Sequence, residues 1–90
     1  TSEIDQMIIA NEKSIPTDHI SAIRHYLEHD ELSSAFEYLI LEIMERGIMQ
    51  PPGDMVRLQE LAFFFGLNDE NECMIDGDFW PKFQKFASKV

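Results

Sequence analysis

Two histidines, His25 and His29, are four residues apart, a spacing that puts both rings on one side of a helix, where they can bind one metal ion. Two ligands make an incomplete site, because zinc takes four and no H-E-x-x-H or paired C-x-x-C motif accompanies them. The lone Cys73 could join them only if the acidic loop around it folded back. We therefore interpret the histidines as surface residues and expect no metal and no other cofactor.

The segment NDENECMIDGDFW gathers five acids, whose carboxylates are the ligands that calcium prefers. A calcium loop of the EF-hand type needs glycine at its sixth position and glutamate at its twelfth. Aligning Gly77 with the sixth position puts Phe83 at the twelfth, so the register excludes this type of loop. The segment is either a solvated loop or an acidic docking surface beside Trp80, formed by Asp69, Glu70, Glu72, Asp76 and Asp78.

Residues suited to covalent or acid–base catalysis are few in this chain. It has no glycine-rich phosphate loop and no G-x-S-x-G motif, and the acids around Cys73 are expected to raise the pKa of its thiol. An acyl-carrier role is also disfavoured, because such proteins attach their prosthetic group at the serine of Asp-Ser-Leu, and HDELSS has another order. We expect a protein that is not an enzyme.

Helical spacing of apolar residues runs through the chain, and no alternation typical of strands is sustained. The pattern predicts a short helix in EIDQMIIANEK, a second from Thr17 to about His29, and a third that Asp30 caps and Gly47 ends. A fourth helix is expected from about Asp54 to Gly66, and a fifth in FWPKFQKFASKV. The fold class is therefore all-α, a helical bundle of about five short helices.

The length suits a single compact domain over residues 1–90, with an N-terminal helix and linker in residues 1–16 and the bundle core in residues 17–90. Apolar spacing assigns Phe36, Leu39, Leu61 and Phe65 to the core, and Phe79, Phe83 and Phe86 to one stripe of the last helix. LAFFFGL is apolar over more than one face, so the fourth helix is expected to be the most buried element.

The third predicted helix, LSSAFEYLILEIMERG, carries apolar residues opposite its core side. An advance of about 100° per residue puts Tyr38 and Leu41 there among three glutamates, Glu31, Glu42 and Glu45. Isolated apolar residues are common on surfaces, and the N-terminal helix or the FWPKF helix could also cover this side. A third interpretation is a partner-binding surface with Tyr38 and Leu41 at its centre and the glutamates as its rim.

Seventeen acids and seven lysines and arginines give a net charge of −10. Nucleic-acid binders neutralise phosphates with basic residues, so direct binding to DNA, RNA or an anionic membrane is not expected. A surface this acidic instead suits a basic protein partner, whose approach it accelerates.

Three features predict a cytoplasmic location. A single cysteine forms no internal disulfide and fits a reducing compartment. No apolar run approaches the roughly 20 residues of a membrane span, and the start TSEIDQM lacks a basic leader followed by an apolar stretch.

IRHYLEHDELSSAFEYLILEIMERGI, followed by LQELAFFFGL and DFWPKF, resembles the small helical immunity proteins of bacterial contact-dependent growth inhibition and of the related Maf polymorphic-toxin systems. The most specific part is YLEH, an acidic turn and AFEYL. The resemblance spans about residues 20–80 and leaves the stretch before Pro16 outside.

This resemblance implies a cytoplasmic protein that binds the C-terminal toxin domain of a cognate effector, often a nuclease, and protects the producing cell. It transfers no catalytic residue and no toxin-contacting position, because the contacts differ among members. The alternative is an acidic helical adaptor or oligomerisation module without a toxin partner. A gene neighbour that encodes a large secreted effector would separate the two hypotheses.

Overall fold

The computed structural model describes residues 2–88, so Thr1, Lys89 and Val90 of the predicted 1–90 domain lie outside the described part of the chain. Within that part the chain forms five α-helices and two short 3₁₀ helices, and no strand. They are α1 (Ser2–Asn11), η1 (Glu12–Ser14), α2 (Thr17–Glu28), α3 (Leu32–Arg46), α4 (Pro52–Phe64), η2 (Glu70–Glu72) and α5 (Phe79–Ala87). The predicted all-α class is confirmed.

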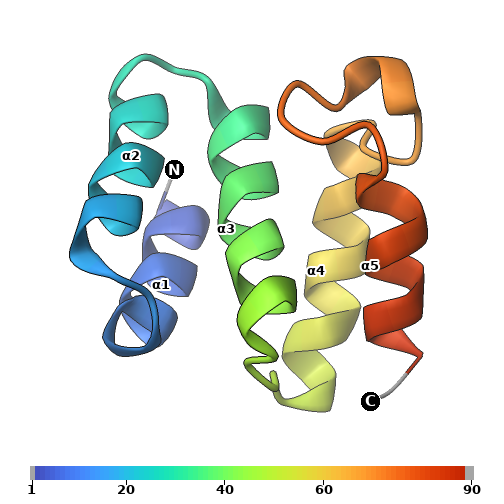
Figure 1. The fold of residues 1–90 in the computed structure, drawn as a ribbon, viewed down its shortest axis with the longest axis horizontal. Helices are drawn as coiled ribbons and strands as arrows, with labels where there is room; N and C mark the ends of the chain where they lie inside the picture. The colour runs from blue at the N-terminus through green and yellow to red at the C-terminus, as the bar shows by residue number, and fades with distance from the viewer. Residues whose placement is uncertain (1, 89–90) are drawn as a thin grey trace.

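Helix α3 lies in the middle of the molecule, with α1 and α2 on one side and α4 and α5 on the other (Figure 1). This position explains why α3 has more buried residues than any other helix of the described chain. They are Ala35, Phe36, Glu37, Leu39, Ile40, Glu42 and Ile43. Two of the seven carry a charge, and both need polar partners inside the fold.

The N-terminal and C-terminal segments pack into the same core as α3. Ile4 and Ile8 of α1 and Ile15 after η1 are buried in it, so α1 and the segment that follows it contribute to this core. The predicted apolar stripe of α5 is confirmed, since Phe79, Phe83 and Phe86 are all buried. Of the four predicted core residues, Phe36, Leu39 and Leu61 are buried, whereas Phe65 is half-buried with its ring centroid 5.4 Å from that of Phe36.

Helix α4 is not the most buried element, contrary to the prediction. Its inner side carries Met55, Leu58, Leu61 and Ala62, which are buried. Its outer side carries Val56, Phe63 and Phe64, which are 58%, 59% and 79% exposed. The apolar run LAFFFGL therefore reflects one core stripe and a second apolar side that no described helix covers, apart from a contact between Phe63 and Trp80.

The ends of α2 and α3 share one capping geometry, in which a residue with positive φ follows the helix. Gly47 ends α3 with a φ of 64°, as predicted. Asp30 occupies the equivalent place after α2 with a φ of 57°. Its amide donates to Leu27 O (3.1 Å), and the Glu31 amide donates to Tyr26 O (2.9 Å). The predicted capping role of Asp30 at the start of α3 is therefore wrong, because its backbone completes α2.

We predict that Phe36→Ala lowers the free energy of unfolding by about 3–5 kcal/mol, because the ring is fully buried and its loss leaves a cavity. The matched variant Phe64→Ala, at the 79% exposed position, should change it by less than about 0.5 kcal/mol. Urea unfolding of both variants measures the difference. Equal losses would contradict the assignment of buried and exposed sides of α3 and α4.

Candidate functional site

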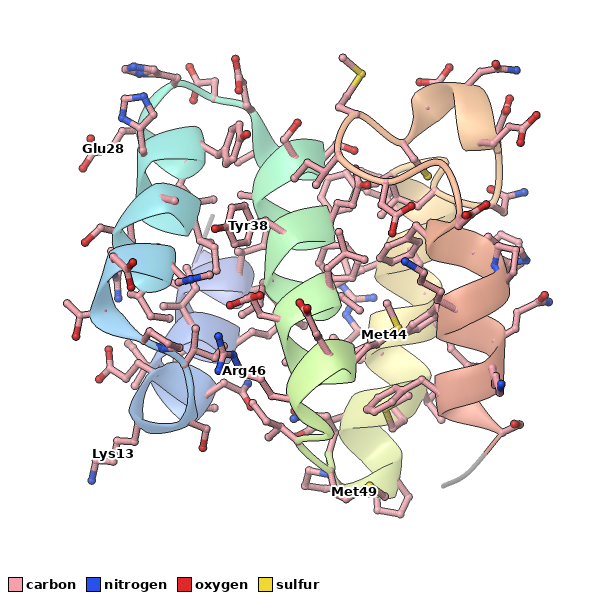
Figure 2. All side chains as sticks on the ribbon, viewed as in Figure 1. Lys13, Glu28, Tyr38, Met44, Arg46 and Met49 are labelled. Atoms are coloured by element: carbon pink, nitrogen blue, oxygen red, sulfur yellow. The ribbon has the colours of Figure 1, made fainter. Side chains whose placement is uncertain are left out.

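Tyr38 lies between α3 and α2 (Figure 2). It is half-buried, its ring centroid is 6.2 Å from that of Tyr26, and its hydroxyl lies 3.3 Å from His19 Nδ1. Burial, followed by the charge of Glu42, raises the Tyr38 pKa. Another helix therefore covers Tyr38, and that helix is α2 rather than α1 or α5. A toxin contact at Tyr38 stays a prediction.

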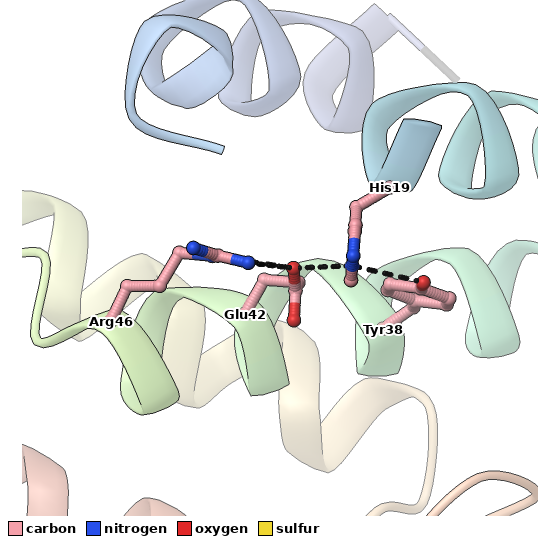
Figure 3. A network of polar contacts seen from close by, with 4 residues as sticks. All are labelled: His19, Tyr38, Glu42 and Arg46. Atoms are coloured by element: carbon pink, nitrogen blue, oxygen red, sulfur yellow. Dashed lines mark hydrogen bonds and ion pairs between the residues drawn. The ribbon is translucent and has the colours of Figure 1, made fainter. Parts of the chain in front are cut away.

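Glu42 is only 5% exposed, so its predicted place on an exposed acidic rim is wrong. His19 Nδ1 lies 2.7 Å from Glu42 Oε1, which is within ion-pair distance. Arg46 Nη2 donates to the same oxygen over 3.2 Å (Figure 3). Helix α2 closes over this side of α3, and the carboxylate serves to join the two helices.

The other three predicted residues of α3 and its N-cap lie at the surface. Glu31 and Glu45 are exposed, as expected, and Leu41 is half-buried. Leu41 lines a groove with Met44 and Ile75, on the α5 side of α3. Tyr38 and Leu41 therefore face different neighbours, and the structure does not bring them together as one exposed centre.

Glu37 is a polar residue that the sequence analysis missed. It is fully buried on α3, and its carboxylate accepts hydrogen bonds from three consecutive amides. The amides of Met74 and Asp76 donate over 3.0 and 2.8 Å, and the amide of Ile75 donates to both oxygens over 3.3 and 3.2 Å. The sequence did contain a sign that this side of the helix is covered. Leu41 and Met44 follow Glu37 at i+4 and i+7, so Glu37 shares a helix side with two apolar residues that another segment is expected to bury.

The loop held by Glu37 lies against α3 and borders two grooves. Ile75 lines both grooves. The groove toward the start of α3, here called the acidic groove, is lined by residues that include Tyr26, Asp30, Glu31, Leu32, Met74 and Ile75. The other, here called the mixed groove, is lined by residues that include Leu41, Met44, Glu45, Asp76, Lys82 and Lys85. On the loop itself, Met74 is 76% and Ile75 40% exposed.

The five acids of the predicted docking loop differ in their surroundings. Asp76 is half-buried and accepts from Lys82 Nζ over 2.5 Å. This bond, followed by one from the Asp78 amide, lowers the Asp76 pKa. The other four, Asp69, Glu70, Glu72 and Asp78, are exposed. They remain accessible to a partner, and binding there stays a prediction.

His25, His29 and Cys73 are the residues that the sequence offered for metal binding or nucleophilic chemistry. The rings of His25 and His29 lie with their centroids 4.3 Å apart, but no group of three potential metal ligands occurs in residues 2–88. Cys73 donates to Leu67 O over 3.4 Å. Burial, followed by the charges of Glu37 and Asp76, raises its pKa to about 11, so little nucleophilic thiolate forms near neutral pH.

Comparisons with protein-family models, with curated proteins and with solved structures found no match for this chain. In residues 2–88, no helix has both the length and the apolar character that crossing a membrane requires. The candidate site therefore rests on geometry alone. It is the surface formed by Glu31, Leu41, Glu45, Met74 and Ile75, which we call the α3 face.

We predict that Tyr38→Ala lowers the free energy of unfolding by about 1–3 kcal/mol, because the ring packs between two helices. The matched control is Glu45→Ala, at an exposed position of the same helix, which should change it by less than about 0.5 kcal/mol. Thermal and urea unfolding measure both. An unchanged melting temperature for Tyr38→Ala would show that the ring contributes no packing between α2 and α3.

We predict that Glu37→Gln speeds hydrogen exchange at the amides of Met74, Ile75 and Asp76. An amide nitrogen cannot accept a hydrogen bond, so at least one of these donors loses its partner, at a cost of about 1–3 kcal/mol. Hydrogen exchange followed by NMR resolves the three amides. Glu45→Gln removes the same charge from the surface of α3 and should leave their exchange unchanged.

Proposed function

We propose that this chain is an immunity protein, which binds a cognate bacterial toxin domain in a one-to-one complex and so neutralises it. The observation that carries the proposal is the α3 face, where exposed apolar side chains stand among exposed carboxylates. Met74 and Ile75 supply apolar surface, and Glu31 and Glu45 supply charge. The resemblance of about residues 20–80 to immunity proteins supports the same function.

The charge of the chain suits a toxin domain that acts on nucleic acid. A nuclease has a basic substrate site, and a chain with net charge −10 offers it a complementary field. Such a field accelerates the encounter, but charge alone gives weak specificity that salt screens. The apolar residues of the α3 face provide what charge lacks, because binding energy concentrates in side chains buried at the centre of an interface, where aromatic residues, methionine and arginine are enriched.

In this proposal the chain acts in the cytoplasm of the producing cell and works as a stoichiometric inhibitor. No residue acts catalytically, and no cofactor or metal takes part. The partner is the C-terminal toxin domain of an effector, and the chain contacts neither nucleic acid nor membrane. The single cysteine is compatible with a reducing compartment.

A second candidate function is an acidic helical adaptor or oligomerisation module. The outer side of α4 favours it, because Val56, Phe63 and Phe64 are more than half exposed. Large exposed apolar residues that cluster often mark contacts between proteins. Under this function the chain self-associates through α4 and has no toxin partner.

The test of the first function is co-expression with the protein encoded immediately upstream, followed by co-purification and a nuclease assay. We expect a one-to-one complex in which nuclease activity is lost. Self-association of the chain without complex formation or inhibition would favour the second function.

We further predict that the association rate of this complex falls steeply with added salt, whereas the dissociation rate changes little. Long-range charge acts mainly on the encounter, and a Debye length of about 8 Å at physiological ionic strength already screens most of it. Stopped-flow or surface binding kinetics between about 0.05 and 0.5 M salt measure both rates. Association that does not depend on salt would contradict the role of the acidic surface.

A further inference from the structure

We propose that the loop residues Met74 and Ile75 are the apolar anchor of toxin binding, and that the acidic groove beside them takes a lysine or arginine of the toxin. The inference rests on the proposed function and names the part of the surface that performs it. It replaces Tyr38 as the centre, because Tyr38 is half-buried under α2.

The first argument is how the loop is held. Glu37 has no cation within ion-pair distance in the described chain, and all of its hydrogen bonds come from the loop amides of Met74, Ile75 and Asp76. A buried carboxylate is costly to desolvate and is stable only when such donors surround it. The backbone of the loop is therefore held by polar contacts beneath it, while the side chains of Met74 and Ile75 stay exposed.

The second argument is what the fixed loop presents. Met74 is 76% exposed, and Ile75 is 40% exposed between the two grooves. A partner that binds an ordered loop does not have to order the backbone, so more of the contact energy appears as affinity. Methionine also adapts its shape to a partner surface. The pair forms an apolar ridge in a fixed position.

The third argument is the charge of the two grooves. The mixed groove contains Lys82 and Lys85, and Lys82 already pairs with Asp76. The acidic groove contains Asp30 and Glu31 and no lysine or arginine, and neither acid makes an ion pair within residues 2–88. The end of α2 and the start of α3 meet here, so their opposite partial charges largely offset each other. Two full negative charges remain, which selects a basic side chain as the occupant.

The test uses the purified C-terminal domain of the protein encoded immediately upstream and measures its binding kinetics with variants of this chain. Met74→Ser and Ile75→Ser should each raise the dissociation rate, together by about tenfold or more. Asp30→Gly combined with Glu31→Gln should slow association several-fold at low salt. Glycine suits the positive φ of residue 30, so this pair removes charge without straining the turn.

Matched controls lie on α4. Asp54→Asn with Glu60→Gln removes the same two charges from a helix outside both grooves, and Phe64→Ser removes an apolar side chain that is 79% exposed. The charge pair on α4 should slow association less than the groove pair does, and Phe64→Ser should change the dissociation rate by no more than about twofold. Melting temperatures of all variants confirm that each one is folded, and Met74→Ser, at the more exposed position, keeps the test valid if Ile75→Ser is unstable.

The outcomes separate the inference from the function. Wild-type binding that the loop and groove variants do not alter would overturn the inference and leave the proposed function standing. If Phe64→Ser alone weakened binding, the inference would also be overturned, the proposed function would stand, and the toxin contact would be assigned to α4. A wild-type chain that neither binds nor inhibits the toxin domain would overturn the proposed function and the inference with it.

Discussion

The burial of α3 is the constraint on which the other features depend. Packed between two pairs of helices, α3 has little free surface, and two of its glutamates lie inside the fold. A buried carboxylate without donors would destabilise the protein by several kcal/mol. Glu42 meets His19 of α2 and Arg46 of its own helix, and Glu37 meets three loop amides. These contacts fix α2 and the loop against α3.

The sequence predicted the apolar core well and the polar contacts poorly. Apolar spacing identifies Phe36 and Leu39 as core residues, because an inward stripe on a helix repeats with the period of the helix itself. The same reasoning predicts that every acidic side chain is exposed to solvent. Glu42 and Glu37 break that rule because α2 and the loop come from other parts of the chain, and their positions are set by tertiary packing that periodicity does not contain. The end of α3 at Gly47 was predictable, because glycine commonly takes the positive φ that follows a helix. The same role of Asp30 at the end of α2 was not predictable, because its conformation is one that glycine usually occupies.

The acids of this chain divide into those that hold the fold and those that remain available. Glu37, Glu42 and Asp76 are engaged by amides or by basic side chains. The exposed acids include Asp30, Glu31, Glu45, Asp69, Glu70, Glu72 and Asp78. The net charge of −10 is therefore spread unevenly over the surface, because ion pairs neutralise the acids locally in some places and not in others. In the mixed groove Lys82 offsets Asp76, whereas in the acidic groove no lysine or arginine of residues 2–88 offsets Asp30 and Glu31.

The exposed apolar residues of α4 and those of the loop differ in the way that each group is supported. Phe63 and Phe64 project from the outer side of a regular helix, whose position is already secured by the buried residues on its inner side. Met74 and Ile75 project from an irregular loop, in which the carboxylate of Glu37 accepts hydrogen bonds from three successive amides. An apolar residue at the same position of α3 would also have filled the space, but it could not have accepted hydrogen bonds from three successive amides. The glutamate at position 37 thus holds the loop backbone, while Met74 and Ile75 keep exposed side chains that can contact another protein.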